Sequence, residues 1–330
     1  MSGVDLEYWT ICLSFLGLVV SFAAIVPELD MKTWWVRNWI YGRQQIFWIL
    51  FFIIGLYVTT VKLDAFYHGA ILTIMVAALI YAFSSIYPYL PIFSKQNAHV
   101  KTSNKFTDVS LLIANVLQDN KRYDDLLQII EAADPDIVFL SEVDEAWVNN
   151  ISSLKDRYAH HVELPGKDYN GLCLYSRCPI MDVQTRYLVQ EHVPSFLMDV
   201  ALQSDVVLKL FALHPRPPRP EDAPEKLDQE LRIVAHEAYE SELPVIVTGD
   251  LNEVGWSRAL RRFEQMSGLR DAQCGRMICN SYNAKIPLVR WPLDHAYHSP
   301  DIILKTMKRL PKFGSDHFPV MFEFRLPTAK

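Results

Sequence analysis

The sequence predicts an α/β domain preceded by three transmembrane helices, and three observations support this fold class. Long charge-free apolar windows fill the first 93 residues. A strand–helix–strand pattern begins near residue 108, and the apolar runs that follow end repeatedly on a carboxylate, an amide or an imidazole. We therefore expect a membrane region at 1–93, a linker at 94–107 and one α/β domain at 108–330.

The three N-terminal windows contain no Asp, Glu, Lys or Arg. Tyr8–Val26, Gln44–Val61 and Ala65–Phe93 are 19, 18 and 29 residues long, and about 20 apolar residues cross a bilayer. Core helices of a soluble domain are the weaker alternative, because windows this apolar leave almost no polar face. Asp5 and Glu7 stand where a cleaved signal peptide carries basic residues. The lipid bilayer is therefore an expected partner.

The distribution of Lys and Arg predicts the orientation. Basic residues near the window ends gather on one side: Lys32, Arg37 and Arg43 before the second window, and Lys95, Lys101 and Lys105 after the third. The other side carries Lys62 alone. The positive-inside rule then predicts a multi-pass protein of the inner (cytoplasmic) membrane with its C-terminal domain in the cytosol.

The charge of the C-terminal part limits its function class. From Lys105 onward the chain has 26 Lys and Arg against 33 Asp and Glu. A nonspecific nucleic-acid binder needs a basic surface that displaces counterions, which this composition does not favour. The charge-free windows also disfavour a transporter, since no ionisable side chain of these types marks an ion path.

The first elements of the domain are a strand, a helix and a second strand. Residues 109–114 form an apolar run that ends on Asn115. A helix follows, with apolar residues at helical spacing over 126–133 and a stop at Asp134-Pro135. Residues 137–140 then form a buried strand that ends just before Ser141-Glu142. Taken alone, Asn115 suits a turn and Glu142 a solvated strand end.

Four further strands are predicted at 171–176, 185–189, 196–202 and 206–213, several with the alternation of an antiparallel sheet. The last runs into His214. The Pro-rich sequence that follows, at 215–220, cannot form a helix or an inner strand, so we predict a surface loop there.

A helix at 227–240 leads into the strand on which the site prediction centres. Val245–Val247 is β-branched and is expected to be buried on both faces. After Gly249, the side chains of Asp250 and Asn252 fall on the same side of an extended backbone at the strand's exposed end. The alternative is a simple turn that caps the helix predicted at 257–267.

Two late segments complete the set of candidate residues. A strand at 294–298 opens on Asp294, and Asp316-His317 precedes the terminal strand at 320–324. Eight polar residues thus stand at the ends of apolar runs: Asn115, Glu142, His214, Asp250, Asn252, Asp294, Asp316 and His317. Oxygen ligands with added imidazole suit Mg²⁺, and no zinc-type cysteine spacing, serine elbow or phosphate-binding glycine loop accompanies them.

The order and wording of these motifs resemble the endonuclease/exonuclease/phosphatase (DNase I-like) superfamily, in a bacterial, membrane-anchored form. The resemblance covers residues 105–326 and rests on Asn115, LSEV around Glu142, YNG at 169–171, LHP at His214, GDLN at 250–252, LDH at Asp294 and SDHFP at 315–319. It implies a four-layer α/β/β/α sandwich that cleaves phosphoester bonds with Mg²⁺ or Mn²⁺.

The resemblance also implies a metal site. Glu142 is the expected principal ligand, with Asn115 and Asp316 in or near the coordination shell.

The remaining motif residues are implied to act on the substrate. Asp250 would orient or deprotonate the attacking water, and Asn252 would hold a phosphate oxygen. His317 would serve as general base or as donor to the developing charge, with its tautomer fixed by Asp294. His214 would assist the leaving oxygen.

His295 and His298 are expected to be packing or rim residues. They are not part of the predicted catalytic set.

The sequence therefore predicts a membrane-anchored, Mg²⁺-dependent hydrolase of a phosphodiester or phosphomonoester, with a lipid-derived or membrane-proximal substrate. A tethered nuclease acting on DNA or RNA is the first alternative, although the acidic domain shows no basic, aromatic-rich insertion. The second is a noncatalytic binding or signalling module on the same fold.

Overall fold

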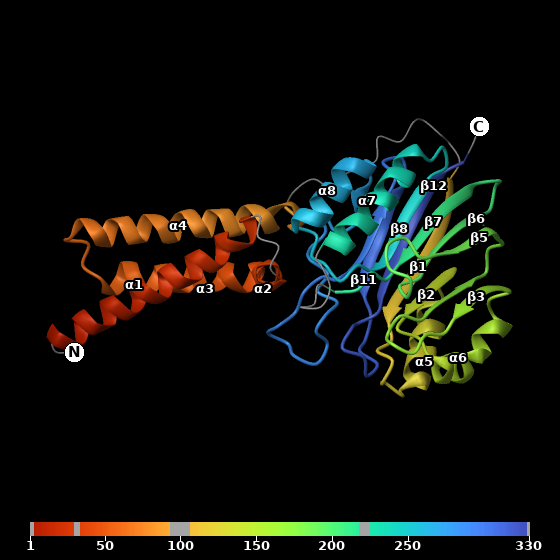
Figure 1. The fold of residues 1–330 in the computed structure, drawn as a ribbon, viewed down its shortest axis with the longest axis horizontal. Coiled ribbons are helices and arrows are strands. Elements are labelled where there is room, and N and C mark those ends of the chain that lie inside the picture. Colours follow the sequence, from red (N-terminus) through yellow and green to blue (C-terminus); the bar gives the residue numbers. More distant parts are fainter. Residues whose placement is uncertain (1–2, 30–33, 93–105, 218–224, 329–330) are drawn as a thin grey trace. The chain divides into compact units, whose positions relative to one another are not determined.

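We describe a computed structural model that covers residues 3–29, 34–92, 106–217 and 225–328 (Figure 1). The chain falls into two compact units, Met1–Pro88 and Tyr89–Lys330. The linker predicted at 94–107 lies outside the described residues, except for Phe106 and Thr107, which begin the strand β1. Each unit is described by itself.

The first unit is helical, as its apolar windows predict. Its helices are α1 (Gly3–Ile25), η1 (Val26–Glu28), α2 (Trp34–Asn38), α3 (Arg43–Thr60) and α4 (Phe66–Ile86), and η2 (Tyr87–Tyr89) follows. Three stretches are long and apolar enough to cross a membrane: Leu6–Glu28, Arg43–Thr60 and Phe66–Tyr89. The three long apolar helices are thus confirmed.

The long helices of the first unit pack against one another and leave apolar side chains outside. Leu13, Tyr57 and Met75 belong to one buried cluster shared by α1, α3 and α4. Phe15 and Phe52 are more than half exposed, which suits contact with lipid rather than with water.

The second unit contains two six-stranded mixed sheets. Sheet A has the strand order β11 (Ile303–Arg309), β12 (Val320–Pro327), β1 (Phe106–Asn115), β2 (Ile137–Ser141), β4 (Leu172–Ser176), β3 (His160–Leu164). Sheet B has the order β5 (Ile180–Arg186), β6 (Ser195–Ala201), β7 (Val207–Leu213), β8 (Val245–Asp250), β10 (Asp294–His298), β9 (Arg270–Asp271).

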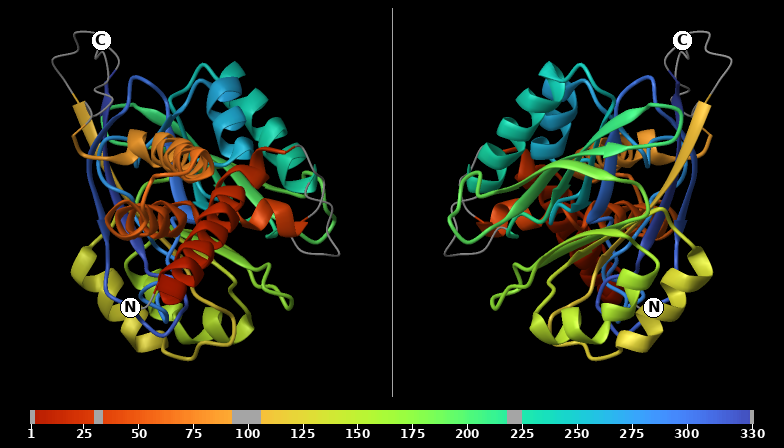
Figure 2. Two further views of the ribbon diagram at one scale, coloured as in Figure 1. Left: turned by 90° about the vertical axis from the view of Figure 1, so that its left-hand side faces the viewer. Right: turned by 90° about the vertical axis from the view of Figure 1, so that its right-hand side faces the viewer.

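Helices cover the outer face of each sheet, as the views in Figure 2 show. Sheet A packs against α5 (Tyr123–Ala133), α6 (Glu145–Asn150) and η3 (Ser152–Asp156), and sheet B packs against α7 (Glu225–Glu240) and α8 (Arg258–Ser267). The inner faces share one core, in which Ile113 and Phe139 of sheet A meet Leu210 and Ile246 of sheet B. The predicted four-layer sandwich is confirmed.

Several predicted elements differ from the observed ones. The strand predicted at 185–189 is wrong, because the chain pairs over Ile180–Arg186 instead, as β5 at the edge of sheet B. This strand is mostly exposed, so it lacks the apolar pattern that marks an inner strand. The sequence pattern also predicted no element over α6 or β11.

Gly249 is required where β8 approaches β7. Its φ is +138°, and a Cβ at this position would lie 1.9 Å from the carbonyl oxygen of Leu213. Since this carbonyl belongs to the paired backbone of β7, the clash cannot be relieved by rotating a side chain. We expect Gly249→Ala to lower the free energy of unfolding by about 2–4 kcal/mol, measured by denaturant unfolding of the full chain in detergent.

Gly268 provides the matched control for this substitution. Its φ is also positive, at +68°, but no heavy atom outside its own neighbourhood would lie within 4 Å of a Cβ added there. Gly268→Ala should therefore lower the free energy of unfolding by only about 1 kcal/mol, because only the backbone conformation is unfavourable for Ala. Equal losses in the two variants would contradict the steric argument.

Candidate active site

The carboxyl ends of two parallel strand pairs bring the first candidate residues together. In sheet A, β1 and β2 are parallel, with Asn115 paired to Ser141 just before Glu142. In sheet B, β7 and β8 are parallel, which places His214 beside the end of β8 at Asp250. Since parallel strands end at the same edge, each pair presents its polar residues together.

The other candidates reach the same place from antiparallel connections. Asp294 opens β10 directly opposite Asp250 in the register. Asp316 and His317 lie in the loop that precedes β12, and Asn252 follows β8 by two residues. All eight predicted residues therefore converge on one region of the second unit.

Asn115 joins the two sheets through a single amide. Its Nδ2 donates to Glu142 Oε1 over 2.8 Å and to Asp250 Oδ2 over 2.9 Å. Its Oδ1 accepts from the backbone N–H of Leu117 at 3.0 Å. These bonds fix the amide orientation and hold two carboxylates from different sheets close to each other.

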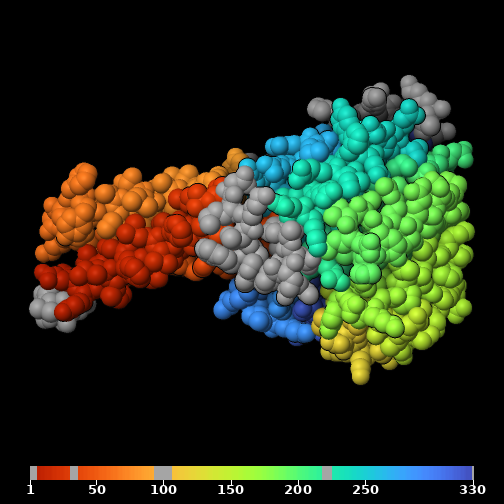
Figure 3. All heavy atoms as spheres, in the orientation of Figure 1, coloured from red at the N-terminus to blue at the C-terminus, as the bar shows by residue number. Residues whose placement is uncertain are grey.

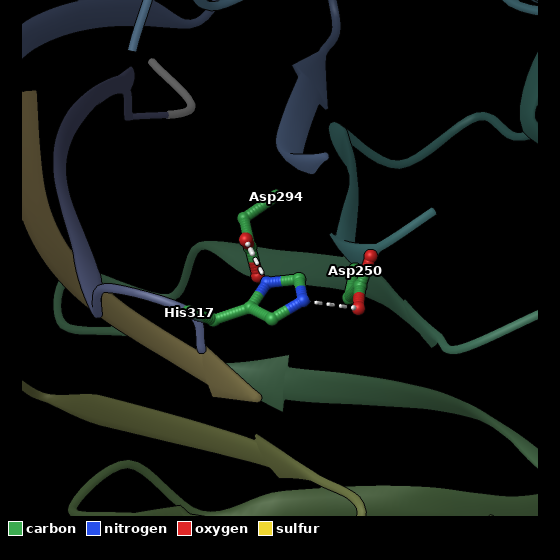
Figure 4. A group of neighbouring side chains, drawn as sticks. All are labelled: Asp250, Asp294 and His317. Carbon is green, nitrogen blue, oxygen red and sulfur yellow. Dashed lines mark hydrogen bonds and ion pairs between the residues drawn. The ribbon is translucent and has the colours of Figure 1, made fainter. Parts of the chain in front are cut away.

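His317 lies between two aspartates (Figure 4). Its Nδ1 is 2.8 Å from Asp294 Oδ2, and its Nε2 is 3.6 Å from Asp250 Oδ2. Burial lowers the pKa of His317, but the charges of Asp294 and Asp250 outweigh it and raise the pKa to about 10. The two carboxylates therefore favour the protonated form of this imidazole, which lies between them.

His214 faces the carboxylates of Glu142 and Asp250. Its Nε2 is 3.7 Å from Glu142 Oε1, and its Nδ1 is 3.8 Å from Asp250 Oδ2. Burial lowers the pKa of His214, but its interaction with Glu142 and the charge of Asp250 raise the pKa to about 9. Both imidazoles therefore face the Asp250 carboxylate, and His214 also faces Glu142.

Asn252 and Asp316 lie at the edge of this group. The Asn252 side chain donates from Nδ2 to the carbonyl of Pro215 at 3.0 Å, which ties it to the residue after His214. Burial raises the pKa of the Asp316 carboxyl, with His317 lowering it and the charge of Glu142 raising it. The Asp316 carboxyl therefore lies within the electrostatic reach of both Glu142 and His317.

The donor set fits a hard divalent cation. Among the described residues, Glu142 Oε2 is buried and has no hydrogen-bond partner, an arrangement that costs free energy unless something else binds that oxygen. Oxygen atoms of carboxylates are the ligands that Mg²⁺ and Mn²⁺ prefer. Asp250, Asp294 and His317 also offer ligand atoms within 4.8 Å of one another, but His317 Nδ1 is already engaged by Asp294.

Backbone conformation also directs two of the candidate side chains. Glu142 and Asn252 adopt left-handed φ values of +61° and +50°, which residues with a side chain seldom do. Such values persist where surrounding contacts impose them, and they often occur at functional sites.

Three residues near the site had no role in the sequence prediction. Ser315 Oγ donates to the carbonyl of Asn115 and accepts from the N–H of His317. Ser281 Oγ accepts from the N–H of Asp294 at 3.1 Å, and the Tyr282 ring lies 5.0 Å from the His317 ring. Ser315 belongs to a recognisable motif, whereas Ser281 and Tyr282 lie in a stretch without any periodicity.

The histidines left out of the predicted set lie in the protein interior. His295 Nε2 is 2.9 Å from the Glu253 carbonyl, and burial lowers the pKa of His298 to about 4. Both are buried side chains of β10. The prediction that they are packing residues agrees with these contacts.

Comparison with known families identifies one match. The sequence profile described as "Endonuclease/Exonuclease/phosphatase family" matches residues 108–317. A comparison with curated proteins gives no match.

Solved structures of similar fold match about two thirds of this chain. Zebrafish (D. rerio) TDP2 in complex with a single-stranded DNA product is 18% identical, with a TM-score of 0.56, over 66% of this chain and 98% of that one. A family protein from Bacteroides thetaiotaomicron is 16% identical, with a TM-score of 0.56, over 67% and 99%. ANGEL2, a 2',3'-cyclic phosphatase bound to adenosine-2',3'-vanadate, is 14% identical, with a TM-score of 0.56, over 68% and 97%. At these identities the likeness establishes the fold.

Proposed function

The chain belongs to the endonuclease/exonuclease/phosphatase family of phosphoester hydrolases, and from this premise we propose that it is a membrane-anchored, metal-dependent phosphoesterase. One observation carries the proposal: the Asn115 amide binds Glu142 and Asp250 at once, which assembles carboxylates and imidazoles from both sheets into a single buried group. The three long apolar helices support attachment to a bilayer. The substrate is a phosphodiester or phosphomonoester at the membrane.

Glu142 is the proposed principal ligand of Mg²⁺ or Mn²⁺, through the Oε2 atom that no described residue binds. Asp316 is the second proposed ligand, because its carboxyl lies in the electrostatic reach of Glu142. Asn115 would orient the Glu142 carboxylate, since its own Oδ1 already accepts from Leu117. When bound, the ion supplies positive charge beside the phosphate oxygens.

The remaining residues account for the proton movements of hydrolysis. Asp250 orients a water molecule whose oxygen attacks phosphorus while its proton passes to the Asp250 carboxylate. As the P–O bond to the leaving group breaks, the leaving oxygen takes a proton from His214.

Hydrogen-bond donors stabilise the negative charge that develops on the phosphate. His317 Nε2 and the Asn252 amide donate hydrogen bonds to the phosphate oxygens. Asp294 holds the other ring nitrogen of His317 at 2.8 Å and so fixes which nitrogen faces the substrate.

A nuclease would use the same chemistry, and one similar structure contains a DNA product. The part of the chain from Lys105 onward nevertheless has seven more acidic than basic residues, whereas binding along a nucleic acid requires neutralisation of several phosphates. We therefore rank a membrane-proximal, non-nucleic-acid phosphoester first.

A substrate panel tests this function and the metal requirement together. Full-length protein in detergent is incubated with bis-p-nitrophenyl phosphate, phospholipids, RNA and plasmid DNA. We expect hydrolysis of the first two with Mg²⁺ or Mn²⁺, complete loss in EDTA, and recovery when the metal is restored.

Other outcomes of the panel identify the alternatives. Cleavage confined to RNA or DNA would show that the protein is a nuclease and would contradict the proposed substrate class. Absence of any metal-dependent hydrolysis, together with a change only in partner binding for Glu142→Ala, would favour a noncatalytic module.

A further inference from the structure

A closed loop with a defined base lies between β9 and β10. Tyr282 and Trp291 pair across the base: the Tyr282 N–H donates to the Trp291 carbonyl at 2.9 Å, and their rings stack at 5.6 Å. Asn283 Oδ1 accepts from the N–H of Lys285 at 2.7 Å and so shapes the first turn. We call residues 283–290 the 283–290 loop.

The base of the 283–290 loop is attached to the candidate active site. The N–H of Ala284 donates to the carbonyl of Asp316 at 2.7 Å. The Tyr282 ring lies 5.0 Å from the His317 ring. Whatever the loop binds is therefore held next to the residues proposed to act on the phosphate.

The tip of the 283–290 loop exposes apolar side chains to solvent. Ile286, Leu288 and Val289 are 50%, 86% and 38% exposed, and the residue between the first two is an exposed proline. Single exposed apolar side chains are common on protein surfaces, but an unbroken run of four is not. In Figure 3 the blue stretch that contains this loop stands out at the lower edge of the second unit.

The charges around the tip narrow the choice of partner. Lys285 and Arg290 stand at its two ends, and no acidic residue occurs between them. An apolar tip with basic flanks suits a lipid bilayer, where the tip enters the acyl boundary and the cations meet lipid phosphates. The same chain carries three helices long and apolar enough to cross a membrane, and we therefore take a bilayer as the partner.

We propose that the 283–290 loop binds the bilayer surface through Ile286, Leu288 and Val289 and presents the active site to phosphoesters carried by membrane lipids. The bilayer contact follows from the loop itself. The substrate class rests on the proposed function, because it requires that the site hydrolyses phosphoesters.

The bilayer contact is tested first, without reference to activity. The full chain with Leu288→Cys, in a Cys12→Ser background, carries an environment-sensitive fluorophore and is placed in vesicles of phosphatidylcholine and phosphatidylglycerol that contain a nitroxide-labelled lipid. We expect the fluorescence to shift to the blue and to be quenched by the nitroxide. Val183→Cys on β5, where the side chain is 41% exposed, should show neither change and controls for nearness to the vesicle.

A probe at position 288 that stays in water would overturn the bilayer contact, whatever the enzyme hydrolyses. Shielding that depends on protein concentration rather than on lipid would assign the loop to a second copy of the chain and overturn the proposal as well.

The substrate class is tested with a double variant. For Ile286→Ser/Leu288→Ser we expect kcat/KM on vesicle phospholipid to fall about tenfold, with hydrolysis of bis-p-nitrophenyl phosphate unchanged. The control is Met181→Ser/Val183→Ser, which removes two exposed apolar side chains from β5 and should change neither rate.

The two proposals fail in different ways. If the double variant hydrolysed vesicle phospholipid as fast as the wild type does, the lipid-borne substrate class would be overturned. A quenched probe at position 288 in a protein that hydrolyses no phosphoester would overturn the proposed function and leave the bilayer contact standing.

Discussion

Replacement of Asp250 by Asn is expected to remove nearly all phosphoester hydrolysis and to leave the fold intact. The Asp250 side chain is 1% exposed and is contacted by Asn115 at 2.9 Å, His317 at 3.6 Å and His214 at 3.8 Å. The Asn side chain has the same shape but cannot accept a proton from water. We expect kcat to fall by about 10²–10⁴-fold, measured with bis-p-nitrophenyl phosphate at saturating Mg²⁺.

Asp182→Asn is the matched control for this variant. Asp182 is an exposed residue of β5 with a left-handed φ of +46°, a conformation that Asn tolerates well, so both activity and stability should be unchanged. Retention of more than about a tenth of wild-type kcat in Asp250→Asn would remove Asp250 from the proton transfer. Near-UV circular dichroism of both variants shows whether a loss of activity arises from loss of the folded structure.

The inner strands were predictable because a strand buried on both faces appears in the sequence as a continuous apolar run. β2 and β8 are buried along their whole length, and their continuous apolar runs end close to where the strands end. Their polar successors, Glu142 and Asp250, could therefore be placed at strand ends from the sequence alone. Edge strands such as β5 and β11 carry mixed, half-exposed side chains, so neither periodicity nor composition separates them from loops.

Contacts between the two sheets could not be derived from spacing. Asn115 and Asp250 are 135 positions apart and are joined by one hydrogen bond. The pairing depends on the sheets facing each other, a property of the whole sandwich that no local pattern encodes. Their shared place at the ends of apolar runs and the resemblance in motif order grouped these residues. Neither assigned a part to Tyr282 or Ser281, whose positions depend on the loop between β9 and β10.

The sequence motif and the site geometry together predict that Glu142 binds the metal. Glu142 combines a buried oxygen that no described residue binds with a second oxygen held by Asn115. In Glu142→Gln the shape and the left-handed backbone at +61° are kept, but the negative charge is lost and one terminal atom becomes a donor facing the ion. We expect the Mg²⁺ concentration for half-maximal activity to rise by about 100-fold or more.

Direct binding separates loss of the metal from loss of catalysis. Isothermal titration with Mn²⁺ should show the same weakening in Glu142→Gln, whereas Glu145→Gln, in the exposed first turn of α6, should bind the metal as wild type does. Undiminished Mn²⁺ binding in Glu142→Gln would move the ion to another group, of which Asp250, Asp294 and His317 have the closest ligand atoms. The hydrogen bond between Asp294 Oδ2 and His317 Nδ1 occupies one atom of each of these two residues, so an ion in that group would have to bind through their other atoms. The titration therefore decides whether Glu142 or the group of Asp250, Asp294 and His317 holds the cation.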